Sequence, residues 1–337
     1  MPFVRALVLV GLLSSGTSSQ LVAGQRPVHT YSIVARDPVT GDLGVAVQSH
    51  WFSVGPTVPW AEAGVGAIAT QSLVDVSYGA LGLELLRGGK TAHETMRALV
   101  AADAHPELRQ VAIVDARGRV AVHTGDHCIA EAGHRTGDGY SVQANLMWRD
   151  TVWGAMAGAF EQAKGDLAER MLVALEAAQA EGGDIRGQQS AAILVVRGES
   201  SGRSWEDRRV DLRVEDHPEP LAELRRLLRL HRAYEHMNAG DLAMEENDFE
   251  RASREYGAAE KLAPGNAEML FWHGITMAGA GRVDEAKPLL ARAYAIDPNW
   301  RTLVERLPRS GLLPDDPELV RTLMQVAPAA ADAAARK

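Results

Sequence analysis

A run of charged and polar side chains that could bind a substrate lies at residues 184–190, Asp-Ile-Arg-Gly-Gln-Gln-Ser. A glycine pair ends a predicted helix just before this run, and residues 191–197 are predicted as a strand. Binding sites are commonly built on loops that join such elements. Asp184 is suited to orient an amine or a water molecule, and Arg186 is suited to bind a substrate carboxylate through two hydrogen bonds, with Gln189 beside it. An Asp–Arg ion pair that only fixes the loop is the alternative.

Uncharged polar residues end several of the predicted strands. They are Gln48, Ser49, Thr70, Gln71 and Ser72, and Asn145 is a further polar candidate. Their side chains donate hydrogen bonds or hold water, but none is a strong base. We assign Ser49, Thr70, Asn145 and Asp184 as candidate catalytic residues, and Gln48, Gln71, Arg186 and Gln189 as candidate substrate contacts. One hypothesis uses Ser49 or Thr70 as a nucleophile together with Asp184.

Two glycines begin the strand that is predicted for residues 64–71. Gly64 and Gly66 lack side chains, so their backbone N–H groups are accessible to a developing negative charge. We therefore assign them as candidate oxyanion-binding groups. The alternative is that these glycines only permit close packing.

A cluster of potential metal ligands was also considered. It comprises His123, Asp126, His127, Cys128 and His134. These residue types suit zinc, but their spacing matches no strong zinc signature. No phosphate-binding loop, dinucleotide fingerprint or HExxH motif occurs in the chain. We therefore predict no metal site and no cofactor, and we expect the lone cysteine to be a buried small hydrophobic residue.

Composition predicts a globular protein of two domains that does not bind nucleic acid. The 337 residues are 46% hydrophobic and 23% charged, which supplies ample material for a core. The net charge is −9, and the arginines of residues 208–229 are interleaved with acids and leucines. A nucleic-acid binder would instead show a basic stripe with aromatic residues.

The first 24 residues have the pattern of a secretory signal peptide. Arg5 precedes a short apolar run at residues 6–13, and small residues at 22–24 form a suitable cleavage site. The apolar run is too short to span a bilayer, and serines interrupt the segment. A retained membrane anchor is the alternative. We predict a periplasmic or secreted protein without membrane contact after cleavage.

The elements that position the candidate residues are predicted in the order strands, two helices, strands, two helices, strands. Strands are expected at 31–37, 43–49, 64–71, 110–114, 119–124, 140–146, 191–197 and 209–214. Helices are expected to end at Gly88, to start at a Thr91/Glu94 capping box, and to span 153–163, 167–180 and 221–234. Helices inserted in pairs between antiparallel hairpins favour stacked sheets between helical layers over a doubly wound parallel sheet.

The C-terminal part contains the same landmarks twice, 34 positions apart. The pairs are Gly240 and Gly274, Ala252 and Ala286, Ala259 and Ala293, and Pro264 and Pro298. Small residues at this period match the tetratricopeptide pattern of paired helices. Two repeats are fewer than the roughly three units that stable arrays need, so flanking helices are expected to cap them. We predict that this module binds a protein partner.

Several motifs in the N-terminal part resemble a known family. The strongest are Thr30-Tyr-Ser-Ile-Val-Ala-Arg-Asp, Thr40-Gly-Asp-Leu-Gly-Val-Ala-Val-Gln-Ser, Val58-Pro-Trp-Ala-Glu-Ala-Gly-Val-Gly-Ala and Gly182-Gly-Asp-Ile-Arg-Gly-Gln-Gln-Ser-Ala. With Ala69-Thr-Gln, Ala132-Gly-His and Gln143-Ala-Asn, they resemble domain-of-unknown-function family 1028 over residues 30–217. The resemblance implies the fold of N-terminal-nucleophile hydrolases, a four-layer αββα sandwich, but it supplies no substrate.

That fold makes Thr30 the candidate nucleophile. In such hydrolases the first residue of the first strand attacks an amide carbonyl, and its own α-amino group, with a reference pKa of about 8, is the base. A cut after Gly24 leaves residues 25–29 in front of Thr30, so a second cleavage directly before Thr30 is required. The chain also departs from proteasome-like members, because no lysine precedes Lys90. The alternative is a threonine of high β-propensity at a strand start.

We therefore predict an α+β chain in which an αββα sandwich precedes an all-α helical-repeat module. The predicted boundaries are 1–24 for the signal peptide, 25–218 for the sandwich, 219–233 for a linking helix, 234–300 for two repeats, and 301–337 for a capping helix and frayed tail. The predicted function is an exported amidohydrolase that acts on a small amide or peptide-like bond. A non-catalytic ligand-binding or assembly protein on the same fold is the alternative, and homodimerisation is left open.

Overall fold

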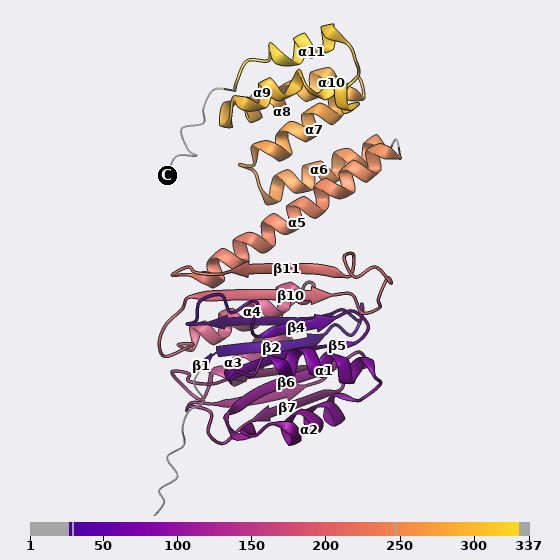
Figure 1. The fold of residues 1–337 in the computed structure, drawn as a ribbon. Coiled ribbons are helices and arrows are strands. Elements are labelled where there is room, and N and C mark those ends of the chain that lie inside the picture. Colours follow the sequence, from indigo (N-terminus) through magenta and orange to yellow (C-terminus); the bar gives the residue numbers. More distant parts are fainter. Residues whose placement is uncertain (1–26, 29, 247, 330–337) are drawn as a thin grey trace, which may run out of the picture.

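The computed structural model describes residues 27, 28, 30–246 and 248–329, so the segment predicted as a signal peptide lies outside the described residues. The chain has a sheet-rich N-terminal part and a helical C-terminal part, joined by one long helix (Figure 1). This confirms the prediction of a mixed α+β protein. Within the described ranges, no helix combines the length and apolar character that a bilayer crossing requires.

Eleven described strands form two antiparallel sheets. The first sheet contains β1 (Pro27–Val28), β4 (Pro59–Glu62), β5 (Gly66–Leu73), β6 (Arg109–Asp115) and β7 (Val120–Thr124). The second contains β2 (Thr30–Arg36), β3 (Leu43–Ser49), β8 (Gly133–Gly137), β9 (Tyr140–Ala144), β10 (Ser190–Val196) and β11 (Arg208–Val214). In the first sheet β5 lies beside β6, and in the second the order is β11-β10-β3-β2-β9-β8.

The two sheets pack face to face. Val34 on β2 and Val45 on β3 lie in one buried cluster with Ala69 on β5 and Ala112 on β6. Side chains of a strand point alternately to its two faces, so every second residue of these strands faces the other sheet. Any polar residue at such a position is enclosed between the sheets, which decides the surroundings of the candidate site.

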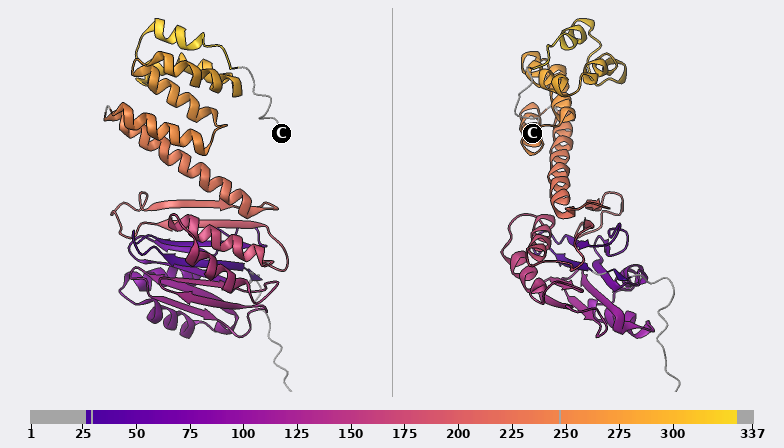
Figure 2. Two further views of the ribbon diagram at one scale, coloured as in Figure 1. Left: turned by 180° about the vertical axis from the view of Figure 1, so that it is seen from behind. Right: turned by 90° about the vertical axis from the view of Figure 1, so that its left-hand side faces the viewer.

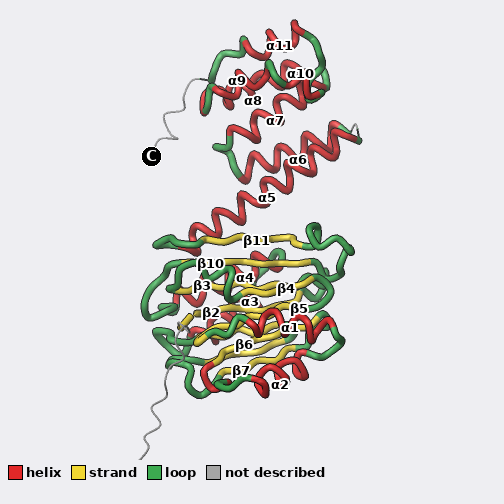
Figure 3. The backbone as a smooth tube through the Cα atoms, in the orientation of Figure 1, coloured by secondary structure: helices red, strands yellow, loops and turns green. Residues whose placement is uncertain are grey.

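A helix pair lies on the outer face of each sheet (Figure 3). Helices α1 (Ser77–Arg87) and α2 (Ala92–Ala102) pack on the first sheet, where Ile68 and Val111 belong to their apolar cluster. Helices α3 (Val152–Gln162) and α4 (Leu167–Ala180) pack on the second, against residues such as Ile33. The order of elements matches the prediction, and α2 begins at the predicted capping box, with Glu94 N–H donating to Thr91 Oγ1 over 3.1 Å.

Some boundaries differ from the prediction. Strands β1, β4 and β8 were not predicted, because β1 has two residues, β4 follows a proline-rich loop and β8 carries exposed polar residues without apolar alternation. The strand expected to reach residue 146 ends at Ala144, and Leu146 adopts φ 57°, which ends the extended conformation. Between these strands and the helices lie the short turn η1 (Pro106–Leu108) and the connecting loops.

Helix α5 (Pro220–Glu245) belongs to both parts of the protein. Leu224 and Leu228 are buried in the core of the second sheet and its helices, whereas Met237 lies in the core of the helical part. Arg225 fastens α5 to α4 through ion pairs with Glu169 and Glu176, at 2.7 and 2.5 Å. The predicted linking helix is thus the first section of a continuous helix that carries the helical part away from the sheets (Figure 2).

The helical part consists of two hairpins followed by shorter helices. They are α6 (Phe249–Leu262), α7 (Ala267–Gly279), α8 (Val283–Ile296), α9 (Asn299–Val304), α10 (Leu307–Ser310) and α11 (Pro317–Met324). The two hairpins make equivalent contacts. A Cβ added to Gly240 would lie 2.5 Å from the Tyr256 ring, and one added to Gly274 would lie 2.9 Å from Leu290. Both contacts join positions 16 residues apart, and the two glycines are 34 residues apart.

Candidate functional site

Uncharged polar side chains from both sheets meet between them at one end of the strands. They are Thr30, Ser32, Ser49, Gln71, Gln110, Ser141, Gln143 and Asn145, which we call the polar cluster. Each of these residues has 0% exposure. They come from β2, β3, β5, β6, and β9 with the residue that follows it, so five segments of the chain build one site.

Strand alternation explains why these residues face one another. Thr30 and Ser32 share the face of β2 that presents Val34 to the opposite sheet, whereas Tyr31 and Ile33 point toward α3 and α4. The same alternation applies on the other strands of the cluster. The cluster therefore continues the apolar contact between the sheets, with hydrogen bonds in place of methyl groups.

Thr30 is the first residue of β2 and is held by three neighbours. Its Oγ1 donates a hydrogen bond to Ser49 Oγ over 3.1 Å. Its carbonyl oxygen accepts from the Asn145 backbone N–H at 3.1 Å and from Gln71 Nε2 at 3.2 Å. Asn145 Nδ2 lies 3.5 Å from the same oxygen. The head of β2 is thus fixed on both its side chain and its backbone.

Gln110 connects the strands around this position. Its Nε2 donates to the carbonyls of Ala144 and Gly133 at 2.9 and 3.2 Å. Its Oε1 accepts from Gln71 Nε2 at 2.7 Å and from Asn145 Nδ2 at 2.9 Å. A single side chain of the first sheet therefore ties two strands of the second sheet to β5, so it positions the groups that hold Thr30.

A second chain of hydrogen bonds extends from Gln71 along the sheet. Ser32 Oγ donates to Gln71 Oε1 over 2.6 Å, and Gln143 Nε2 donates to Ser32 Oγ over 2.6 Å. Ser141 Oγ donates to Gln143 Oε1 over 2.9 Å. Because every member of the polar cluster is a hydroxyl or an amide, none of its side chains can accept a proton near neutral pH. The eight side chains therefore contain no general base.

The cluster reaches an open cavity through Thr124 and His134. Gln110 Nε2 donates to Thr124 Oγ1 over 3.1 Å, and Thr124 Oγ1 lies 2.9 Å from His134 Nδ1. Both residues line a cavity of about 490 Å³, together with Cys128 and Trp153. Partial burial of the ring, and secondarily the neighbouring His123, lower the pKa of His134. The imidazole is therefore biased toward its neutral form.

Asp184 and Arg186 form the ion pair that was the alternative to a substrate clamp. Arg186 Nη2 lies 2.6 Å from Asp184 Oδ2, and its Nε lies 3.0 Å from Oδ1. Asp184 Oδ2 also accepts from the backbone N–H of His50, one residue beyond Ser49. Burial, and secondarily the charge of Asp184, raise the pKa of Tyr31. In this structure the guanidinium is engaged by Asp184, and the pair fixes the loop against the end of β3.

Two candidate substrate contacts lie outside the polar cluster. Gln48 belongs to the face of β3 that carries Ala46 toward α4, and neither polar atom of its buried amide has a partner among the described residues. Gln189 is half-buried, and its Nε2 donates to Asp216 over 3.1 Å. Neither side chain is directed at Thr30.

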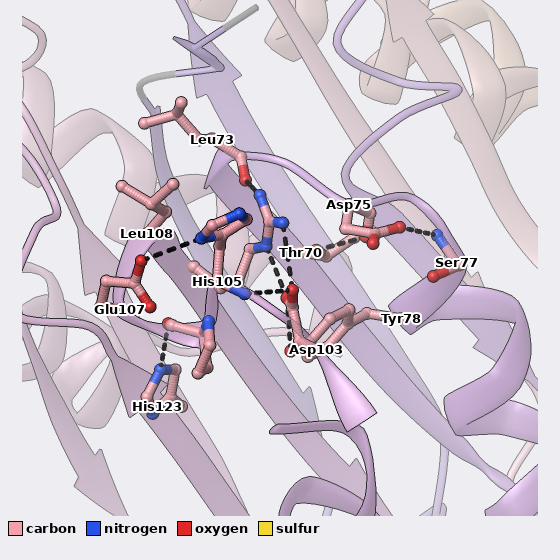
Figure 4. Close-up of polar contacts among 12 residues, drawn as sticks. Thr70, Leu73, Asp75, Ser77, Tyr78, Asp103, His105, Glu107, Leu108 and His123 are labelled. Carbon is pink, nitrogen blue, oxygen red and sulfur yellow. Dashed lines mark hydrogen bonds and ion pairs between the residues drawn. The ribbon is translucent and has the colours of Figure 1, made fainter. Parts of the chain in front are cut away.

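Thr70, Gly64 and Gly66 are not near Thr30. The Thr70 side chain shares the α1-facing side of β5 with Ile68, and its hydroxyl donates to the Asp75 carbonyl over 3.1 Å (Figure 4). Gly66 lies five residues from Gln71, or about 17 Å along β5, and Gly64 precedes it in a turn. A Cβ on Gly66 would lie 2.6 Å from Leu86 and 2.7 Å from the Val114 carbonyl, so close packing explains this glycine.

Two of the potential metal ligands, His123 and Cys128, direct their side chains at backbone carbonyl groups. His123 Nε2 lies 2.7 Å from the Pro106 carbonyl oxygen, and Cys128 Sγ lies 3.4 Å from that of Arg109. Burial raises the pKa of the Cys128 thiol. In the described part of the chain, no three His, Cys, Asp or Glu side chains are arranged to hold a metal ion.

Gln110, Gln143, Ser32 and Ser141 were missed as site residues. Each of them alternates along its strand with residues that face the helices, so its side chain points to the other sheet. Polar residues of one parity near the ends of several strands are the signal that the sequence offers. Reading it requires knowing that these ends meet, which depends on the pairing of the two sheets.

Comparison with known proteins gives a family but no function. The family model described as "Family of unknown function (DUF1028)" matches residues 30–224, starting at the first residue of β2. The chain is similar to the crystal structure of the DUF1028 protein SPO2555 from Silicibacter pomeroyi, with 30% identity and a TM-score of 0.54. That match covers 64% of this chain and 92% of the other. No curated protein matches the chain.

Proposed function

Because the chain belongs to the DUF1028 family, a family of unknown function, its activity must be argued from its own residues, and we propose that it is an exported amidohydrolase of the N-terminal-nucleophile type. Thr30 is the nucleophile, and its own α-amino group is the base once the preceding residues have been removed. The substrate is a small amide or a peptide-like bond. The observation that carries this proposal is Thr30 at the head of β2, inside a cluster without an ionisable side chain.

The layers around Thr30 support the same conclusion. Two sheets pack face to face and each carries a helix pair on its outer side, which resembles the αββα order of N-terminal-nucleophile hydrolases. In that fold the nucleophile stands at the start of a strand between the sheets, as Thr30 does here. The amine of a terminal residue has a reference pKa of about 8, so a useful fraction is unprotonated near neutral pH.

The reaction proceeds in two steps. In the first, Thr30 Oγ1 adds to the substrate carbonyl while its proton passes to the α-amino group. The C–N bond breaks, the leaving amine takes that proton, and an ester joins the acyl group to Thr30. In the second, water adds to the ester and gives one proton to the α-amino group. The C–O bond then breaks, the acid leaves, and the proton returns to the threonine oxygen.

Ser49 and Asn145 act as positioning residues in this mechanism. Ser49 Oγ accepts the hydrogen bond from Thr30 Oγ1, so it orients the hydroxyl. Asn145 holds the Thr30 carbonyl through its backbone N–H, while its side chain is fixed by Gln110. Gly64 and Gly66 take no part in this mechanism, because they lie before and at the far end of β5 from Gln71.

The experiment that tests the proposal is the identification of the first residue of the exported protein, followed by an amide-hydrolysis screen. We expect N-terminal sequencing and intact mass to give Thr30. The form that starts at Thr30 should hydrolyse at least one amide, and a form that retains residues 25–29 should not. Equal turnover by both forms would eliminate the α-amino mechanism.

A non-catalytic role on the same fold is the second candidate. It is favoured by the complete burial of Thr30 and by the hydrogen bonds of its hydroxyl and carbonyl. A purified mature protein that starts at Gln25 and turns over no amide would support this reading.

The helical part is proposed to bind a protein partner as a pair of tetratricopeptide-like repeats. Its support is the matched close contact of Gly240 with Tyr256 and of Gly274 with Leu290, which places the small residues of the 34-residue period at helix crossings. Export is proposed from the sequence of residues 1–24 alone. Affinity purification from the periplasmic or secreted fraction tests both points together.

A further inference from the structure

Strand β1 occupies the outer edge of β5 directly before the proposed nucleophile. Pro27 and Val28 pair with Leu73 and Ser72 in antiparallel register. The chain then passes to the other sheet, where Thr30 begins β2. On that side of β5, β4 pairs only with the first half of the strand, so β1 is the sole described strand beside its last residues. Removal of residues 25–29, the leader, would leave this edge unpaired.

The edge beneath the leader is held rigidly. Arg109 is 2% exposed, its Nη1 donates to the Leu73 carbonyl, and its Nε donates to Asp103 Oδ2 over 2.7 Å. Tyr78 donates its hydroxyl hydrogen to the same carboxylate over 3.0 Å (Figure 4). Because the end of β5 is anchored by buried groups of the first sheet and its helices, it is preorganised and loses little entropy when a new strand binds.

We propose that, once the leader is removed, the Ser72–Leu73 edge binds an extended peptide as an added strand. This inference rests on the proposed function, since it requires Thr30 to become the first residue. The peptide runs in the direction of the leader, with two acyl-side residues where Pro27 and Val28 pair now. Its scissile carbonyl belongs to the next residue of the peptide and is the one that Thr30 Oγ1 attacks.

Backbone pairing sets the substrate class. Main-chain hydrogen bonds to a sheet edge give affinity for extended peptides regardless of most side chains. A compact amide without neighbouring peptide groups makes none of these bonds. The substrate is thus a peptide with at least two residues before the scissile bond, and the retained leader is an intramolecular inhibitor of the same edge.

The test uses a fluorescently labelled peptide with the leader sequence Gln-Arg-Pro-Val-His. It is titrated, with anisotropy as readout, into the full chain that retains residues 25–29 and into the same chain cut directly before Thr30. We expect at least tenfold tighter binding to the cut form. The matched control is the same peptide N-methylated at its valine and histidine. N-methylation removes the backbone N–H donor, and because alternate residues of an antiparallel strand donate to one neighbour, one of these two positions donates to β5. Loss of that bond should weaken binding about fivefold.

The outcomes separate this inference from the proposed function. Equal binding to both forms, or no effect of N-methylation, would refute the peptide edge even if the cut form hydrolyses amides. Tight, N-methylation-sensitive binding without any amide turnover would support the edge and remove the proposed hydrolase. The cut form carrying Thr30→Ala should keep its peptide affinity within about twofold, since the edge does not use this hydroxyl.

Discussion

The sharpest test of the polar cluster is the replacement of Gln110 by leucine. Gln110 is fully buried and, together with Gln71, joins the two sheets at the head of β2. Leucine has a similar volume, so the substitution removes hydrogen bonds while it creates little empty space. Its effect on stability therefore measures the hydrogen bonds of this one side chain.

The magnitude follows from the groups that lose their partner. The Ala144 and Gly133 carbonyls lose the donor that the Gln110 amide supplies. Gln71 and Asn145 lose an acceptor, but both side chains still have the Thr30 carbonyl within reach. A buried polar group left without a partner costs about 1–3 kcal/mol, so we expect the free energy of unfolding to fall by about 3 kcal/mol.

Urea denaturation followed by tryptophan fluorescence measures this change. The control is Gln189→Leu, because Gln189 is half-buried and its side chain donates to Asp216 at the surface, away from the polar cluster. We expect the control to change stability by less than about 0.5 kcal/mol. If Gln110→Leu destabilised the protein by less than about 1 kcal/mol, the cluster would not be a tightly satisfied network and our account of how Thr30 is held would fail.

Three further predictions concern the nucleophile and the helical part. In the form that starts at Thr30, Thr30→Ala should lower amide hydrolysis by at least about a thousandfold in initial-rate assays, whereas Thr30→Ser should retain turnover; equal rates would exclude this nucleophile. Gly240→Ala should destabilise the helical part by about 1–3 kcal/mol in urea, since its Cβ would lie 2.5 Å from the Tyr256 ring. Gly257→Ala is the control and should be neutral or stabilising, because a Cβ there would meet nothing within 4 Å. A larger loss of stability in Gly257→Ala than in Gly240→Ala would contradict the packing. Burial lowers the pKa of His273, so the unfolded chain binds a proton there more readily than the folded chain, and the stability should fall as the pH drops below about 6.5. In thermal unfolding between pH 7 and 5, His273→Phe should make the stability depend less steeply on pH. An unchanged pH dependence would contradict the assignment.

Local patterns were sufficient to predict the order of elements. The Thr91/Glu94 capping box and the apolar spacing of residues 167–180 fixed two helices, because both signals depend only on neighbours along the chain. The exposed strand β8 was missed, because it lacks an apolar face and is recognised only by its pairing with β9. The continuity of α5 was missed for a related reason, since its two buried stretches belong to two different cores.

The site was predicted less completely than the fold. Thr30, Ser49, Gln71 and Asn145 meet as a group, but only the resemblance to a family drew attention to Thr30. Thr70 was assigned to the site because it is a polar residue near a strand end, yet it faces the side of β5 opposite to Gln71, since adjacent residues of a strand face opposite sides. Gln110 was missed because its role comes from strands that are distant in sequence and meet only after the sheets pack.

The 26 residues of α5 make a rod of about 39 Å with one end embedded in each core. Because this helix is continuous, a partner bound to the helical part would be held at a fixed distance from the sheets, which a flexible linker would not do. A truncation within α5 would expose apolar residues of this helix to water, so neither fragment is expected to be as stable as the whole chain.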